Sequence, residues 1–96
     1  MQVNLPDRVR RDIRTFAEAN NVKKVVLFGS RARGDNGERS DIDIAVYGGD
    51  FDSFYWDVKE KTHSLLMFDI VQMDAAVAGE LNNEIERDGV VIYEKA

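Results

Sequence analysis

Hydrophobic residues recur along the chain first with the period of a helix and then with that of a strand. Between Pro6 and the Asn20-Asn21 pair, apolar side chains return every three or four positions, at Val9, Ile13, Phe16 and Ala17. This spacing predicts a helix that has Pro6 in its first turn and ends at the two asparagines. The apolar, β-branched run from Lys24 to Phe28 then predicts a buried strand.

The rest of the chain alternates between strand-like and helix-like segments. In chain order the expected elements are a polar loop at 30–39, a strand at 41–47, a helix whose apolar face is Phe51, Phe54, Tyr55, Val58 and Thr62, a strand at 65–73, a helix from Asp74 to Gly89, and a strand at 90–93. A loop alone separates the first two strands, which favours antiparallel pairing. A helix joins the second and third strands, which favours a parallel crossover. The predicted fold class is α/β (α+β), a mixed β-sheet covered by helices.

Composition narrows the class of protein without identifying it. The 96 residues are expected to form a single domain, 1–96, and 44% of them are hydrophobic, which is too many for a disordered chain. No apolar run approaches the ~20 residues of a membrane span, no signal peptide is visible, and cysteine is absent. These features favour a cytoplasmic protein with no membrane contact. The net charge of −5 argues against sequence-specific nucleic-acid binding, because such binding relies on neutralising phosphates with basic side chains.

Three aspartates lie inside apolar, strand-like segments, where a charge is costly unless something neutralises it. Asp41 and Asp43 alternate with isoleucines, so both point to one face of the second strand, and Asp69 alternates in the same way on the third. If the third strand lies beside the second, the three carboxylates share a face. Two Mg²⁺ ions, or Mn²⁺ ions, would offset their charge and could bridge the phosphates of a nucleotide. The three aspartates are therefore the predicted metal ligands and catalytic residues.

A glycine-containing turn lies at the end of the first predicted strand. Gly29 lets backbone amides approach a phosphate closely, and Ser30 adds a hydroxyl. Arg31 and Arg33 follow, and the planar fork of an arginine suits phosphate oxygens. These four residues are the predicted nucleotide-binding residues.

Together these residues resemble the polymerase-β-like nucleotidyltransferase superfamily, and in particular its minimal nucleotidyltransferases, the antitoxins of HEPN/MNT toxin–antitoxin pairs. The family pattern is Gly-Ser, ten residues, Asp-x-Asp, and an acid on a later strand. This chain matches it with Gly29-Ser30, Asp41-Ile42-Asp43 and Asp69. The ending, IERDGVVIYE, also looks like the family's, so the resemblance spans essentially the whole chain.

The resemblance implies a role for each residue and a partner for the protein. Gly29 and Ser30 would hold the triphosphate of ATP, Asp41 and Asp43 would bind both metal ions, and Asp69 would bind the catalytic ion and help activate the attacking hydroxyl. Minimal nucleotidyltransferases are commonly encoded beside HEPN-domain proteins, many of them RNase toxins. In some pairs the antitoxin transfers AMP to a toxin tyrosine. The resemblance therefore implies an adenylyltransferase antitoxin in a hetero-oligomer with a HEPN-domain toxin.

Two other functions stay open on the sequence alone. The same chemistry could act on a small-molecule acceptor such as an aminoglycoside, or the protein could neutralise a toxin by binding alone. Trp56 also has two interpretations, because it lies off the apolar face of its helix. It either covers the edge of the core or anchors a partner, since tryptophan is enriched at binding hot spots.

Overall fold

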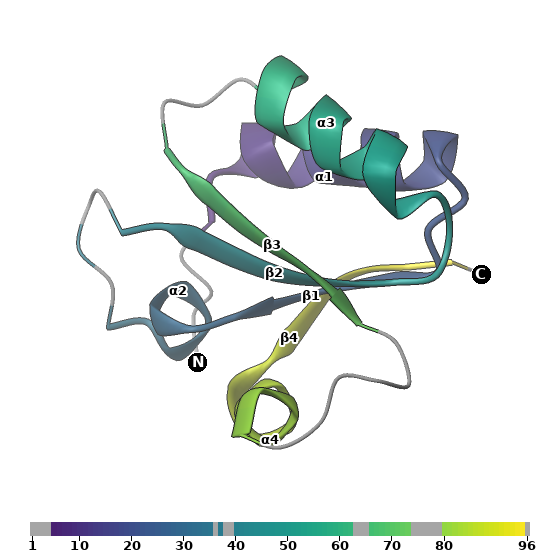
Figure 1. The fold of residues 1–96 in the computed structure, drawn as a ribbon. Helices are drawn as coiled ribbons and strands as arrows, with labels where there is room; N and C mark the ends of the chain where they lie inside the picture. The colour runs from purple at the N-terminus through teal and green to yellow at the C-terminus, as the bar shows by residue number, and fades with distance from the viewer. Residues whose placement is uncertain (1–4, 36, 38–39, 63–65, 74–79, 96) are drawn as a thin grey trace.

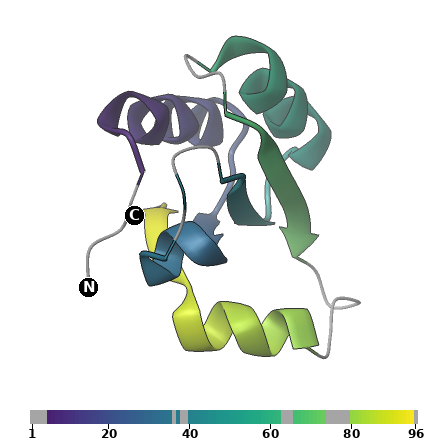
Figure 2. The same cartoon turned by 90° about the vertical axis from the view of Figure 1, so that its left-hand side faces the viewer.

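Four strands and four helices make up the computed structural model, which describes residues 5–35, 37, 40–62, 66–73 and 80–95. In chain order they are α1 (Asp7–Ala19), β1 (Lys24–Phe28), α2 (Ser30–Arg33), β2 (Ile42–Tyr47), α3 (Phe51–Lys61), β3 (Phe68–Met73), α4 (Glu80–Asp88) and β4 (Val90–Glu94). Figure 1 shows α1 and α3 side by side over one face of the sheet, and Figure 2 shows α4 on the opposite side.

The sheet is mixed, as the sequence predicts. Its strand order is β3-β2-β1-β4. β1 pairs antiparallel with β2 and with β4, and β2 pairs parallel with β3. The loop connection and the helical crossover therefore give the two pairings expected of them, and the predicted fold class is confirmed.

Both faces of the central strands are buried, each against its own group of hydrophobic side chains. The larger group lies between the sheet and the two helices α1 and α3, and it receives Val25, Leu27, Ile42 and Ile44. The smaller group lies on the α4 side and includes Val26, Phe28, Ala45, Met73 and Ile85. Alternate residues of β1 thus enter different cores, which explains why its sequence is apolar throughout rather than alternating.

Several element boundaries differ from those predicted. Pro6 is the cap that precedes α1 rather than a residue of its first turn, whereas the helix ends at Asn20 as expected. The predicted polar loop at 30–39 begins with the short helix α2, and β2 begins at Ile42, one residue later than predicted. A helix of four residues contains no apolar period, so hydrophobic patterning could not reveal it.

The helix after β2 follows its predicted pattern closely. Asp50 caps α3, since its carboxylate accepts a hydrogen bond from the Ser53 amide at 3.2 Å. The third strand is described from Phe68, and the predicted cap at Asp74 lies outside the described residues. Within the described ranges, no helix has the length and apolarity that crossing a membrane requires.

Replacing Ile42 tests the direction in which β2 faces. Its side chain is fully buried among the apolar residues between the sheet and α1 and α3. Ile42→Asp would place an unpaired charge there, so we expect loss of the cooperative unfolding transition in urea at neutral pH, followed by circular dichroism. Ile42→Val is the matched control and should cost about 0.5–1.5 kcal/mol. An Ile42→Asp protein with the wild-type urea midpoint would contradict this placement.

Candidate active site

Two of the three predicted metal ligands lie opposite each other on neighbouring strands. Asp43 of β2 and Asp69 of β3 are direct partners in the register of the parallel pair. Residues paired in this way point to the same face of a sheet. Asp43 is half-buried, whereas Asp69 is exposed on an edge strand. The structure therefore brings these two carboxylates together on the face that their alternation predicts.

Asp41 reaches the same region from outside the sheet. It precedes β2, its side chain is exposed, and each of its neighbours makes a backbone hydrogen bond. On one side, the amide of Ile42 donates to the carbonyl of Met67 at 2.9 Å. On the other side, the Nε of Arg31 donates to the carbonyl of Ser40 at 3.1 Å.

The electrostatics of the site show that the three carboxylates interact. The pKa of Asp43 is raised from 3.8 to about 6, chiefly because burial penalises its charged form. The negative charges of Asp69, Asp41 and Glu84 raise it further, while the nearby Arg33 opposes the shift. The site therefore carries more negative charge than its own cations balance.

Oxygen donors of this kind suit Mg²⁺ or Mn²⁺, and the raised pKa of Asp43 is the signature expected of carboxylates that a cation would relieve. Among the described residues, however, no group of three or more metal-ligating side chains is already gathered closely enough to hold an ion. The donor set fits a divalent metal ion, and the metal site itself stays a prediction.

Gly29 forms the turn where β1 passes this carboxylate. The last residue of β1, Phe28, pairs with Asp43, and Gly29 follows with a positive φ of 74°. A Cβ atom at this position would collide with the Oδ2 atom of Asp43. Only glycine satisfies both the backbone conformation and the close approach. Ser30 comes next, half-buried at the start of α2, and triphosphate binding at this turn stays a prediction.

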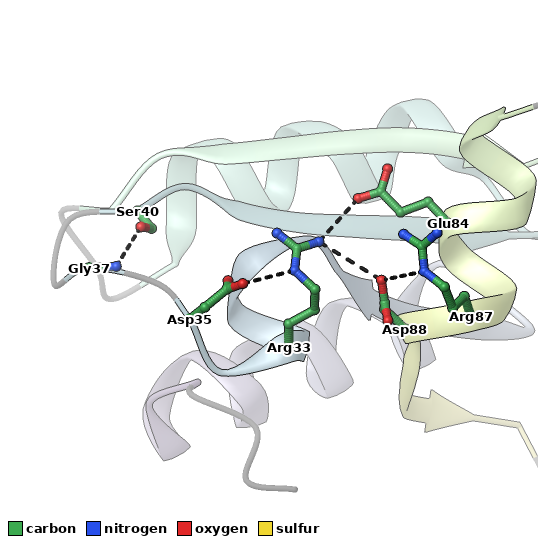
Figure 3. Close-up of polar contacts among 7 residues, drawn as sticks. All are labelled: Arg33, Asp35, Gly37, Ser40, Glu84, Arg87 and Asp88. Atoms are coloured by element: carbon green, nitrogen blue, oxygen red, sulfur yellow. Dashed lines mark hydrogen bonds and ion pairs between the residues drawn. The ribbon is translucent and has the colours of Figure 1, made fainter.

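The two arginines after this turn have different surroundings. Arg31 is buried, with 3% of its surface exposed. Arg33 has a side chain that is 36% exposed and forms ion pairs with Asp35 at 3.1 Å, Glu84 at 3.5 Å and Asp88 at 3.9 Å (Figure 3). The hydrogen bond that the Nε of Arg33 donates to Asp35 raises the pKa of Arg33, and the negative charges of all three carboxylates act in the same direction. Binding of phosphate by either arginine stays a prediction.

Glu84 and Asp88 are the site-lining residues that sequence reasoning missed. They lie one turn apart on α4, so they share a helix face, and both point toward Arg33 in Figure 3. Helical periodicity could have placed these two acids on one face. Nothing in the sequence indicates that this face packs against the arginine after β1, because that contact depends on how α4 packs on the sheet.

Comparison with known proteins agrees with this arrangement. Residues 11–96 match the family described as polymerase beta, nucleotidyltransferase. The chain belongs to this family. The resemblance seen in the sequence is thereby confirmed, and the chain is a nucleotidyltransferase domain.

One curated relative shares a short, closely similar segment. A stretch of 32 residues is 62% identical to a candidate protein adenylyltransferase of Methanocaldococcus jannaschii. This stretch spans 32% of the present chain and 32% of that protein.

Solved structures show the same fold. A toxin–antitoxin crystallised with AMP-PNP superposes with a TM-score of 0.69 and 24% identity, covering 90% of this chain and 73% of the other. A mutant of the MntA–HpeT toxin–antitoxin, in which glutamate replaces two aspartates separated by one residue, gives a TM-score of 0.68 and 22% identity over the same shares of the two chains. A Sulfolobus solfataricus protein described as a candidate nucleotidyltransferase gives a TM-score of 0.56 and 21% identity over 93% of this chain and 79% of the other.

The raised pKa of Asp43 predicts a pH-dependent stability in the metal-free protein. Because the folded pKa, about 6, exceeds 3.8, protonation of Asp43 favours the fold, and this stability is lost as the pH rises from about 4 to about 6. The side chain at position 43 cannot ionise in Asp43→Asn. Across that pH interval the free energy of unfolding of this variant should therefore rise relative to that of the wild type, by about 1–2 kcal/mol after allowance for solvent screening. Urea unfolding in EDTA from pH 3.5 to 8 measures the difference. Parallel stability curves for the two proteins would contradict the assignment.

Proposed function

We propose that this protein is a Mg²⁺-dependent adenylyltransferase antitoxin, which transfers AMP from ATP to a hydroxyl of a HEPN-type RNase toxin, with tyrosine as the acceptor. The observation that carries the proposal is the juxtaposition of Asp43 and Asp69, with Asp41 nearby, beside the Gly29-Ser30 turn. In a nucleotidyltransferase domain this juxtaposition supports a role for the carboxylates beside the predicted triphosphate-binding turn.

Five of the predicted site residues have a part in such a transfer. Mg²⁺ held by Asp41, Asp43 and Asp69 would neutralise charge on the phosphates of ATP. The acceptor oxygen attacks the α-phosphorus, the bond from the α-phosphorus to the bridging oxygen breaks, and pyrophosphate leaves. The carboxylate of Asp69 accepts the proton of the acceptor hydroxyl. Gly29 and Ser30 hold the triphosphate in line for this attack.

The position of Asp69 supports a macromolecular acceptor. This residue is exposed, and β3, which carries it, is an edge strand of the sheet. The proton acceptor therefore lies where a side chain on another protein can reach it. The relatives also support a protein acceptor, since one is named for protein adenylylation and two are toxin–antitoxin structures, one of them with AMP-PNP. The mutated pair in MntA–HpeT also has the one-residue spacing of Asp41 and Asp43.

Intact-mass analysis tests the proposed transfer directly. The protein is co-expressed with the product of the adjacent gene, purified, and incubated with ATP and Mg²⁺. We expect the partner to gain mass in whole AMP units. The gain should disappear in EDTA and fall by orders of magnitude in Asp43→Asn, which removes a predicted ligand of both metal ions.

The other outcomes of this experiment identify the competing functions. A tight complex with no mass gain would indicate neutralisation by binding alone. Modification of an added aminoglycoside, with an unmodified partner, would indicate a small-molecule acceptor. Near-normal transfer by a well-folded Asp43→Asn protein would contradict the proposed chemistry.

Trp56 is the predicted anchor for the toxin. Its side chain is 58% exposed on α3 and contacts the ring of Tyr55 edge-on, with ring centroids 5.2 Å apart. Trp56→Ala should weaken toxin binding by about thirty-fold, the effect of losing a ~2 kcal/mol hot spot, and leave Mg²⁺-ATP binding unchanged. Calorimetric titration measures both affinities, with exposed Glu60→Ala on the same helix as the control. Wild-type toxin affinity in Trp56→Ala would move the anchor to another surface, beginning with the arginine-rich first helix.

A further inference from the structure

Asp41 is the one predicted metal ligand that the sheet does not hold. Asp43 and Asp69 belong to paired strands, whereas Asp41 precedes β2 and lies in no helix or strand. Ligands must be held to within about 0.5 Å of their working geometry for a metal site to function. The backbone around Asp41 therefore needs another means of support.

Two hydrogen bonds provide that support, one on each side of the residue. After it, the Ile42 amide is fixed to the Met67 carbonyl ahead of β3, at 2.9 Å. Before it, the Ser40 carbonyl accepts a hydrogen bond from the Nε of Arg31 at 3.1 Å. The first of these bonds continues the sheet, and the second comes from a side chain of α2.

Ser40 also makes two hydrogen bonds with Gly37. Its hydroxyl accepts a hydrogen bond from the Gly37 amide at 2.8 Å, and its own amide donates to the Gly37 carbonyl at 3.3 Å (Figure 3). The hydrogen bond from Arg31 connects Ser40 to α2, which begins directly after Gly29. The segment that carries Asp41 is thereby linked to the predicted triphosphate turn.

The burial of Arg31 fits this role. It is the one charged side chain found buried among the described residues, at 3% exposed. Burying a guanidinium is costly unless its donors are satisfied, so a buried arginine is held by the groups that it binds. Arg33, two residues further on, is by contrast partly exposed and lies among carboxylates.

We infer that Arg31 is a positioning residue that fixes the backbone of Asp41 through Ser40, rather than a phosphate ligand. The inference rests on the proposed function, in which Asp41 binds a metal ion. Arg31 then acts on the metal ion only through Asp41. Residues that orient metal ligands in this way typically change metal affinity by about 10–100-fold when they are replaced.

A double-mutant cycle tests the inference. The four proteins are the wild type, Arg31→Met, Asp41→Asn and the double variant. Mg²⁺ is titrated in the presence of α,β-methylene ATP, which cannot release pyrophosphate. Arg31→Met alone should weaken Mg²⁺ binding about 10-fold or more, but should add less than about 2-fold in the Asp41→Asn background. Arg11→Met, an exposed replacement on α1, is the matched control and should have no effect.

Two results would overturn the inference. If Arg31 bound phosphate directly, the fold-changes that the two substitutions cause in Mg²⁺ affinity would multiply in the double variant. Arg31→Met would then also weaken nucleotide binding in EDTA. An Arg31→Met protein with wild-type Mg²⁺ affinity would likewise exclude the positioning role. If Arg31→Met does not fold, the cycle is run with Arg31→Lys, which keeps a donor and should give a smaller loss with the same non-additivity.

Amide hydrogen exchange separates this inference from the function on which it rests. Arg31→Met should speed exchange selectively at the Ile42 amide and its neighbours, whatever Asp41 does, while Arg11→Met should not. Unchanged exchange at Ile42 would overturn the inference. If Asp41→Asn leaves the Mg²⁺ dependence unchanged, the metal role of Asp41 in the proposed function is wrong, and exchange still reports whether Arg31 holds this segment.

Discussion

A carboxylate held near the start of a buried strand is the constraint on which the site depends. Asp43 loses hydration as part of β2 and faces Asp69 across the parallel pair, so burial and like charge both raise its pKa. The strand forms nevertheless because the opposite face of β2 buries Ile42 and Ile44 completely. Each buried isoleucine contributes about 1.5–3 kcal/mol, which offsets the unfavourable placement of one half-buried acid.

The same carboxylate dictates the path of the chain after β1. Because its Oδ2 atom occupies the space of a Cβ atom at position 29, the turn requires glycine. Gly29 adopts a positive φ and leads at once into α2. That short helix places Arg31 toward the segment before Asp41, and Arg33 toward α4. The two arginines therefore belong to a helix that begins directly after the turn beside Asp43.

The sequence predicted the sheet and the carboxylates because alternation and connection length are local signals. Asp43 and Asp69 lie together as their periodicity requires, and the mixed pairing follows from a loop and a helical crossover. The surroundings of Arg31 and Arg33 could not be predicted in this way. Burial of the first depends on how a four-residue helix packs, and two of the three partners of the second lie about fifty residues away on α4. Contacts of this kind are fixed by tertiary packing, which leaves no periodic trace in the sequence.

Arg33 shows how such packing bears on nucleotide binding. In this structure the guanidinium is shared by Asp35, Glu84 and Asp88, so any phosphate that it binds must compete with carboxylates. Ion pairs as exposed as these contribute little to stability, so exchanging them for a more highly charged triphosphate is energetically accessible. If Arg33 left these ion pairs, the negative charge of Glu84 near Asp43 would lose its compensating cation. Binding of a divalent cation together with the nucleotide would relieve that charge, which links the arginine to the carboxylates through electrostatics alone.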